Sequence, residues 1–393
     1  MAAWPARRID ELCEITSSKR IFAADYVLEG VPFYRGKEIS EKHHGSLSVS
    51  TELFIARTKF DEIRSKFGAP KAGDLLLTSI GALLGSPYVV KQGEEFYFKD
   101  GNLTWFRSLN GLDSQFLYYW ILSPQGKGQL QKSKIGSAQP AFTINLLKQM
   151  EIELPPLPVQ QRIAGILSGY DDLIENNRRR IKILEEMARS LYREWFVKFR
   201  FPGHEKVSRV DSPLGPIPRG WEVKELGDIL ELNYGKALKK VERRDGEFPV
   251  FGSSGIVGYH DAYLVNGPGI IVGRKGNVGS VFWSDEAFFV IDTAYFVTSS
   301  LPLRYLFYAL PSLNFINGDA AVPGLSRRQA YTLEIVVPPT NVLSTFCELA
   351  DTFERQASTF QRKIQNLRRT RDLLLPRLLS GGTGIATLMQ GGD

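Results

Sequence analysis

The segment YRGKEISEKHHG, residues 34–45, concentrates side chains that suit contact with nucleic acid. Arginine and lysine supply positive charge for phosphates, and histidine ring nitrogens can reach base edges in a groove. The candidates in this segment are Arg35, Lys37, Lys42, His43 and His44. An exposed polar loop after a strand would have the same composition, so the sequence leaves both interpretations open.

A second group of polar side chains lies in two glycine-rich stretches, FGSSGIVGYH (251–260) and VGRKGNVGS (272–280). Glycine lets the backbone approach a ligand closely, while the polar side chains can reach phosphates or base edges. The candidates are Ser253, Ser254, Tyr259, His260, Arg274, Lys275 and Asn277, with Arg327 further along the chain. Weaker candidates in the first half are Ser79, Lys132, Lys134 and Gln139. Tight turns that bind nothing also contain such glycines.

Residues for catalysis or metal binding do not form a recognisable pattern. The four histidines and two cysteines lack zinc-ligand spacing. The stretch GVPFYRGKE (30–38) resembles a nucleotide-binding loop, but five residues separate its glycines and Glu38 replaces the required hydroxyl. No Asn-Pro-Pro-Tyr type methyltransferase motif occurs. We therefore expect no catalytic residue, metal or cofactor in this chain, although an enzyme with an unrecognised site stays open as an alternative.

Length and composition point to a protein of two to three domains. The 393 residues carry a net charge of +6, which permits nucleic acid as a partner without establishing it. Two distant cysteines argue against a disulfide framework, and neither a signal peptide nor a long apolar run is evident. These features predict a cytoplasmic protein without a membrane span.

The chain contains an internal duplication. Pro155-Pro156 and Pro338-Pro339 each end a strand-like run and precede a stretch with helical spacing. The offset between these two pairs also aligns Glu151 with Glu334. Upstream, with other offsets, residues 74–85 resemble 269–279, and residues 114–122 resemble 303–310. We therefore predict two copies of a unit in which a long helix follows a globular part.

Both helical stretches have a seven-residue repeat. Seam positions recur at alternating steps of four and three from Ile163 to Trp195 and from Phe346 to Leu378. Such spacing predicts a left-handed coiled coil, with two core helices of a bundle as the alternative. Proline suits the first turn of a helix, so each Pro-Pro pair should lie at a helix start.

A pseudo-two-fold arrangement of the two copies would make these helices antiparallel. An end-to-end register then places Tyr170 opposite Arg371 and Ala188 opposite Phe353. Pairing displaced by one heptad would reject this register. Each helix would be roughly 55–60 Å long at ~1.5 Å per residue. That length is about one and a half turns of duplex DNA, so the pair could set a distance between two DNA half-sites.

Parts of the first helix also suit contact with a partner protein. The run Arg178–Arg180 fits a solvated face, phosphate contacts or docking of a partner, and the sequence leaves these alternatives open. The flank SLYREWFVKFRF (190–201) has more aromatic rings than one partner helix can cover. We expect some of them to contact a domain or a partner subunit. The partner-binding candidates are Arg179, Arg180, Trp195, Phe196 and Phe199.

Residues 154–205, residues 248–297 and YTLEIVVPP (331–339) together resemble the specificity subunit of type I restriction–modification enzymes. The resemblance covers nearly the whole chain. It implies an α+β protein with two similar mixed α/β target-recognition domains and two long helices in an antiparallel, pseudo-two-fold coiled coil. The expected boundaries are 1–155 and 220–338 for the domains, 156–200 and 339–380 for the helices, 201–219 for a linker and 381–393 for a flexible tail.

The resemblance also implies a non-catalytic subunit that reads a split target in double-stranded DNA. Methyltransferase subunits, expected to number two, would bind S-adenosylmethionine. A restriction and translocase subunit, whose presence the sequence leaves open, would use ATP and magnesium. The alternative is a coiled-coil scaffold without sequence-specific DNA recognition. The sequence does not specify the bases or the gap length.

Overall fold

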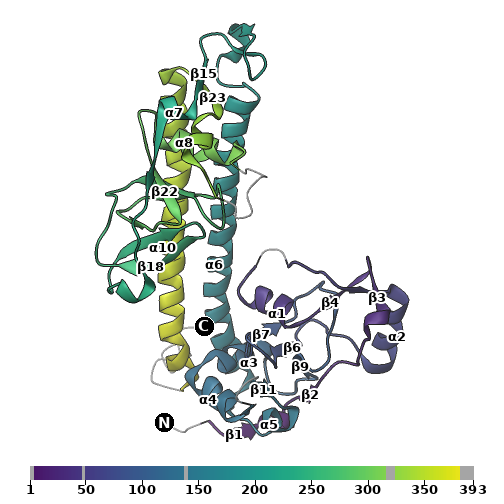
Figure 1. The fold of residues 1–393 in the computed structure, drawn as a ribbon. Helices are drawn as coiled ribbons and strands as arrows, with labels where there is room; N and C mark the ends of the chain where they lie inside the picture. The colour runs from purple at the N-terminus through teal and green to yellow at the C-terminus, as the bar shows by residue number, and fades with distance from the viewer. Residues whose placement is uncertain (1–3, 47–48, 137–139, 316–323, 381–393) are drawn as a thin grey trace, which may run out of the picture. The chain divides into compact units, whose positions relative to one another are not determined.

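The computed structural model describes residues 4–46, 49–136, 140–315 and 324–380 (Figure 1). The chain divides into two compact units. The first contains the residues up to Arg178 together with those from Arg362 onward, and the second contains the residues between them. Each unit therefore combines a globular part with one portion of each long helix.

The globular part of the first unit contains a four-stranded antiparallel sheet in the order β2-β9-β6-β7. A second, mixed sheet has the order β3-β5-β4-β8, with β4 and β8 parallel. The strands are β1 (Ala6–Arg8), β2 (Glu14–Thr16), β3 (Tyr26–Val27), β4 (Val31–Tyr34), β5 (Phe54–Ile55), β6 (Leu75–Thr78), β7 (Pro87–Val89), β8 (Tyr97–Phe98), β9 (Leu103–Arg107), β10 (Lys134–Ile135), β11 (Ala141–Phe142) and β12 (Glu151–Glu153). The helices are α1 (Gly36–His43), α2 (Arg57–Phe67), α3 (Ser114–Leu122), α4 (Pro124–Lys132) and α5 (Ile144–Lys148).

The second unit repeats this plan. Its four-stranded antiparallel sheet has the order β16-β22-β19-β20, and a three-stranded sheet, β18-β17-β21, contains the parallel pair β17 and β21. The strands are β13 (Arg209–Val210), β14 (Ile217–Pro218), β15 (Glu222–Glu225), β16 (Leu230–Tyr234), β17 (Phe248–Gly252), β18 (Gly255–His260), β19 (Gly269–Gly273), β20 (Val281–Ser284), β21 (Phe289–Val290), β22 (Ala294–Ser299) and β23 (Glu334–Val337). The helices are α7 (Leu226–Ile229), α8 (Leu303–Ala309) and α9 (Arg327–Tyr331).

The duplication is visible in individual hydrogen bonds. The amide of Phe142 donates to the carbonyl of Ser79 (2.9 Å), and the amide of Leu325 donates to the carbonyl of Arg274 (2.8 Å). The offset that relates the two Pro-Pro pairs also relates Phe142 to Leu325. The loop after β6 therefore corresponds to the loop after β19, with Ser79 at the position of Arg274.

The two long helices are α6 (Leu157–Tyr192) and α10 (Thr340–Leu379) (Figure 1). Each begins directly after its Pro-Pro pair, as predicted. The α6 helix continues as a π-helical segment, Arg193–Val197, and this wider turn accompanies the burial of two adjacent rings, Trp195 and Phe196. The predicted seam positions of both helices are buried or half-buried, which supports the seven-residue repeat.

Within the first unit the two helices run antiparallel. Ile163 and Leu167, in the N-terminal portion of α6, share a core with Leu375 and Leu378 near the C-terminus of α10. Asp171 forms an ion pair with Arg371. Tyr170, which was predicted to face Arg371, adjoins Asp171, so the pairing agrees with the predicted register to within one residue.

The second unit contains the opposite portions of the same helices, also antiparallel. Ala188 and Tyr192 of α6 lie in one core with Phe346 and Ala350 of α10. The ring of Phe346 is fully buried and lies 4.8 Å from the ring of Phe196. Strands and helices of the second globular part contribute to the same core, so helix packing and domain folding are coupled in this unit.

Candidate nucleic-acid interface

The loop after β19 presents the strongest group of predicted DNA contacts. The amides of Arg274 and Lys275 both donate to the carbonyl of Thr293, at 2.9 and 3.1 Å. Gly276 has a φ of +80°, a left-handed conformation that costs glycine little. The side chains of Lys275 and Asn277 are exposed beside this turn. The loop backbone is therefore fixed while its polar side chains stay accessible.

The ring of Tyr234 contacts two of the predicted cations, Arg274 and Arg327. Tyr234 ends β16, and its side chain is about half exposed. The guanidinium carbon of Arg274 lies 4.9 Å from the centre of its ring, and that of Arg327, from α9, lies 4.4 Å away. Cation–π attraction therefore holds two positive groups at one aromatic side chain.

Neither guanidinium in this cluster has a carboxylate partner among the described residues. One Nη of Arg274 donates to the carbonyl of Asp292 (3.0 Å), and one Nη of Arg327 donates to the carbonyl of Leu232 (3.3 Å). Carbonyl groups orient a guanidinium without neutralising its charge. Tyr234, Arg274 and Arg327, here called the Tyr234 cluster, thus form a positive group suited to an anionic or acceptor-rich ligand.

The serine-rich turn between β17 and β18 adjoins this loop. The side-chain amide of Asn277 lies 3.5 Å from the hydroxyl of Ser254, and Ser280 donates to the carbonyl of Ser253 (2.6 Å). Tyr259 is more than half exposed on β18, whereas His260 is buried and its ring accepts from the amide of Arg244. The fold thus brings the two serines to the β19 loop and turns the His260 ring inward.

The first unit places its predicted cations differently. Arg35 pairs with Glu38 and Glu52, and Lys37 also pairs with Glu52. The hydrogen bonds that Arg35 donates to the carboxylates of Glu38 and Glu52 raise the pKa of Arg35, so its charge is permanent. Because acidic partners already compensate these cations, they attract phosphate less strongly than the Tyr234 cluster does.

The remaining candidates of the first unit are scattered. Lys42 pairs with Glu94, and both side chains are largely buried. Ser79 is buried and bonds the hydroxyl of Thr104 (2.7 Å). Lys132 ends α4, Lys134 is exposed in β10, and Gln139 lies outside the described residues.

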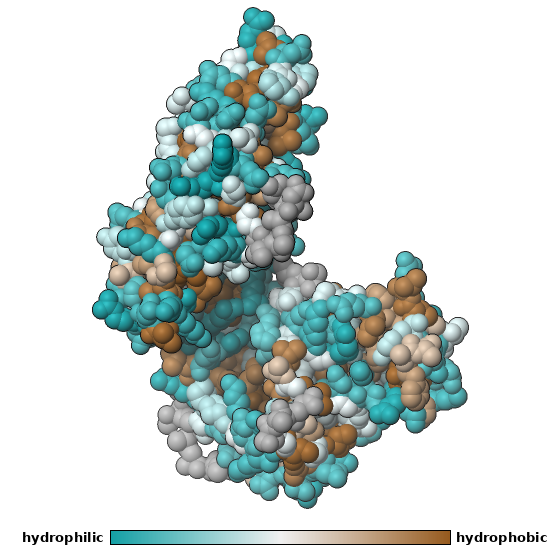
Figure 2. All heavy atoms as spheres, viewed as in Figure 1, coloured by the Kyte–Doolittle hydropathy of each residue, from teal (hydrophilic) through white to brown (hydrophobic). Residues whose placement is uncertain are grey.

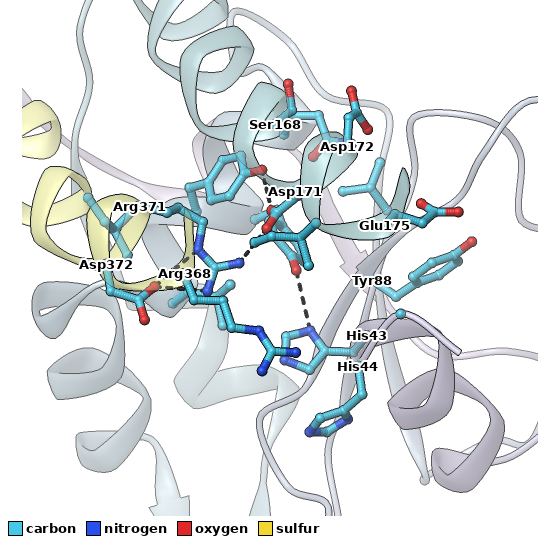
Figure 3. A pocket seen from close by; sticks show the side chains of 18 of the residues that line it. His43, His44, Tyr88, Ser168, Asp171, Asp172, Glu175, Arg368, Arg371 and Asp372 are labelled. Carbon is cyan, nitrogen blue, oxygen red and sulfur yellow. Dashed lines mark hydrogen bonds and ion pairs between the residues drawn. The ribbon is translucent and has the colours of Figure 1, made fainter. Parts of the chain in front are cut away.

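A cavity of about 860 Å³ in the first unit brings the predicted histidines together with the long helices (Figure 3). His43 and His44 line it at the end of α1, and Arg368 and Arg371 line it from α10. Burial, and then the neighbouring His44, lowers the pKa of His43, which favours its neutral ring. At neutral pH, His43 therefore contributes hydrogen bonding here more than charge.

A polar network crosses this cavity. The Tyr119 hydroxyl donates to Asp171 (2.6 Å), and Arg371 pairs with both Asp171 and Asp372 (Figure 3). Burial and the charge of Asp171 raise the pKa of Tyr119, so the hydroxyl stays protonated. The network connects α3 of the globular part with both long helices.

The second unit has the matching hydrogen bond. The hydroxyl of Tyr308, on α8, donates to Glu354 on α10. Glu354 is the counterpart of Asp171 when the two halves are aligned by their Pro-Pro pairs. Each globular part is thus joined to a long helix by the same tyrosine–carboxylate contact.

The partner-binding candidates divide into buried and accessible residues. Trp195 and Phe196 are each 6% exposed and belong to the core of the second unit. These two rings therefore contact a domain of the chain itself. The half-buried Phe199 ring lies 5.5 Å from Trp221. Arg179 is exposed, and the guanidinium of Arg180 lies 5.4 Å from the ring of Phe360.

The arginine run has a structural role at its first residue. Arg178 donates to the carbonyl of His44 (2.8 Å) at the end of α1, where helix carbonyls lack intrahelical partners. Sequence reasoning missed this contact and the involvement of Tyr234. Tyr234 is distant in sequence from both Arg274 and Arg327. The pairing of β16 with β22 and of β22 with β19 brings it to Arg274, and a hydrogen bond from Arg327 of α9 to the carbonyl of Leu232 brings that residue to β16.

A family model described as the type I restriction modification DNA specificity domain matches residues 1–186 and 218–367. The chain belongs to this family. The predicted family is thereby confirmed, and the duplicated fold has its explanation in two successive specificity domains. DNA target recognition in a type I restriction–modification system is the function of such a specificity subunit.

The specificity subunits most similar to this chain include one from Methanocaldococcus jannaschii, of the MjaIX enzyme. It is 28% identical over 428 residues, which cover 96% of this chain and 93% of the relative. The HindI specificity subunit of Haemophilus influenzae is 23% identical, and the alignment covers 68% of this chain and 77% of that subunit. A type I S subunit from M. genitalium has the same fold, with a TM-score of 0.59, 17% identity and 97% coverage of both chains.

Figure 2 shows hydrophilic and hydrophobic residues interspersed on the visible face. Among the described residues, no helix combines the length and the apolar character needed to cross a lipid bilayer. In the same part of the chain, no group of three or more potential ligand side chains is arranged to hold a metal ion.

Proposed function

We propose that this specificity subunit reads a DNA target in two separate blocks, one for each recognition domain. The observation that carries the proposal is the Tyr234 cluster. Its two cations, Arg274 and Arg327, have no carboxylate partner among the described residues, and they lie beside the exposed glycine-containing loop after β19. Such groups are suited to phosphates and base edges. The corresponding loop of the first unit, after β6, occupies the same place in a repeat of the same fold.

The proposed recognition domains are residues 1–155 and 220–338, each followed by its long helix. Two similar domains and two antiparallel helices would present two reading surfaces to one duplex. The unread gap would then be set by the helices. The proposed DNA contacts are led by Arg274, Lys275, Asn277 and Arg327, with Ser253, Ser254 and Tyr259 beside them, and in the first domain by Arg35, Lys37, Lys132 and Lys134.

We also propose that the long helices hold the methyltransferase subunits, two in number because the chain is duplicated. Ile183 and Met187, one turn apart on α6, are 55% and 46% exposed. Exposed apolar side chains that lie close together on a helix suit contact with a protein partner. Arg179 and Arg180 lie in the same part of α6 and would form the polar edge of this surface.

The chemistry of methyl transfer would then belong to the partner subunits, which would bind S-adenosylmethionine. In this proposal the specificity subunit contributes DNA contacts and positions its partners, and a restriction subunit can join the complex in the cytoplasm. The chain offers hydrogen-bonding and charged groups in its loops. In the proposal it supplies recognition by these groups, and the reacting atoms belong to the partner subunits.

DNA protection tests this proposal directly. The chain, assembled with its methyltransferase, is mixed with a library of duplexes, and the protected bases are mapped. We expect two short protected blocks separated by bases whose identity does not matter, with bound sequences favoured ~10³-fold or more over others. Equal protection of all duplexes would contradict the proposal and favour a scaffold without DNA specificity.

A further inference from the structure

Arg274 differs from the other cations of the candidate interface because its side chain is held on several sides. The ring of Tyr234 lies against the guanidinium. The ring of Tyr295, on β22, lies 5.8 Å from the guanidinium carbon. One Nη donates to the carbonyl of Asp292 (3.0 Å). The amide and the carbonyl of Arg274 are also bonded, to Thr293 and Leu325. Main chain and side chain are therefore both fixed before any ligand binds.

Burial, followed by the contact with Tyr234, raises the pKa of Tyr295 to about 12, so its hydroxyl remains a neutral donor to the carbonyl of Leu325 (3.0 Å). This bond connects Tyr295 to Leu325. The preceding residue, Gly324, forms an antiparallel β-bridge with Lys275. The hydroxyl of Tyr295, one of the two rings beside Arg274, is therefore bonded to Leu325, whose amide donates to the carbonyl of Arg274.

We propose that Arg274 reads a guanine in the half-site bound by the second recognition domain. The inference rests on the proposed function. A guanidinium is a planar fork with five N–H donors, and the contact with Asp292 leaves most of them available. The acceptors O6 and N7 of guanine, in the major groove, match two parallel donors of such a fork.

Fixing the fork in advance favours recognition of a base over contact with a phosphate. A phosphate accepts hydrogen bonds from many directions, so a mobile lysine serves it well. A base edge offers two acceptors in one plane, and a donor pair that is already oriented loses less freedom on binding. Tyr234 acts as a positioning residue, since it orients Arg274 through the cation–π contact.

The first recognition domain cannot make the same contact. Ser79 occupies the matching position, is buried, and bonds Thr104. The two halves of the target should therefore differ in how they are read, and changes at Arg274 should affect one half only.

The test is Arg274→Lys in the complete methyltransferase complex, with binding measured on the target and on every single-base variant of it. We expect discrimination at one G·C pair of one half-site to fall by roughly 5- to 150-fold. All other positions should keep their discrimination. Tyr234→Leu should weaken discrimination at the same pair, whereas Tyr234→Phe, which keeps the ring, should not.

Arg219→Lys is the matched control, because Arg219 is exposed in the same unit and outside the candidate interface. Uniform loss of affinity across all sequences, with a weaker salt dependence for Arg274→Gln, would show a phosphate contact and overturn the inference. Unchanged discrimination in Arg274→Lys would overturn it as well. If the unaltered complex itself binds all duplexes equally, the proposed function has failed instead.

Discussion

Replacing Phe346 by alanine should lower the free energy of unfolding of the second unit by about 3–5 kcal/mol. The ring is fully buried where α6, α8 and α10 meet. It packs edge-on against Phe196 and Tyr308 and lies 6.2 Å from Trp195. Alanine would remove the transfer free energy of the ring and leave a cavity among rigid aromatic groups. Urea unfolding monitored by tryptophan fluorescence measures the loss.

Leu349→Ala is the control for this prediction. Leu349 lies one turn further along α10 and is 40% exposed. Its truncation removes a similar apolar group but creates no enclosed cavity, so the cost should stay below about 1 kcal/mol. Equal losses for both variants would show that Phe346 is not at the centre of a packed core.

Exchanging residues 220–337 for the equivalent segment of another family member should replace one half of the DNA target and leave the other half unchanged. The physical reason is that each recognition loop is fixed by bonds inside its own unit, as with Arg274 and Thr293 in the second. Affinity for the original second half-site should fall to the non-specific level, roughly 10³-fold or more. Binding to paired duplex libraries measures both halves at once.

The reciprocal exchange, of residues 1–155, serves as the control and should alter only the first half-site. The gap should stay constant in both chimaeras because the residues of the two long helices are unchanged. Simultaneous change of both half-sites in either chimaera would contradict independent reading by two domains.

The long helices were the most predictable part of the molecule. Their seam depends on local spacing, and the Pro-Pro pairs specify where each begins, so α6 and α10 start within one residue of the expected positions. The antiparallel pairing followed from the duplication, and the Asp171–Arg371 ion pair agrees with it. Periodicity and repetition are recorded directly in the sequence.

The candidate site was less predictable because its members come from separate strands. Arg274 was recognised from its glycine-rich loop, but Tyr234 carries no local signal and depends on the pairing of β16, β22 and β19. Burial also could not be anticipated from loop composition. Ser79 and His260 lie in glycine-containing stretches, and the fold buries both side chains.

The sequence of the methylated sites is the decisive measurement for recognition by two domains. DNA modified by the reconstituted complex would be sequenced with detection of methylated bases, and the common target extracted. Two recognition domains on paired helices should yield two short specified blocks separated by a constant run of unspecified bases. A single uninterrupted block, or methylation at sites with no common sequence, would contradict reading by two domains held apart on paired helices.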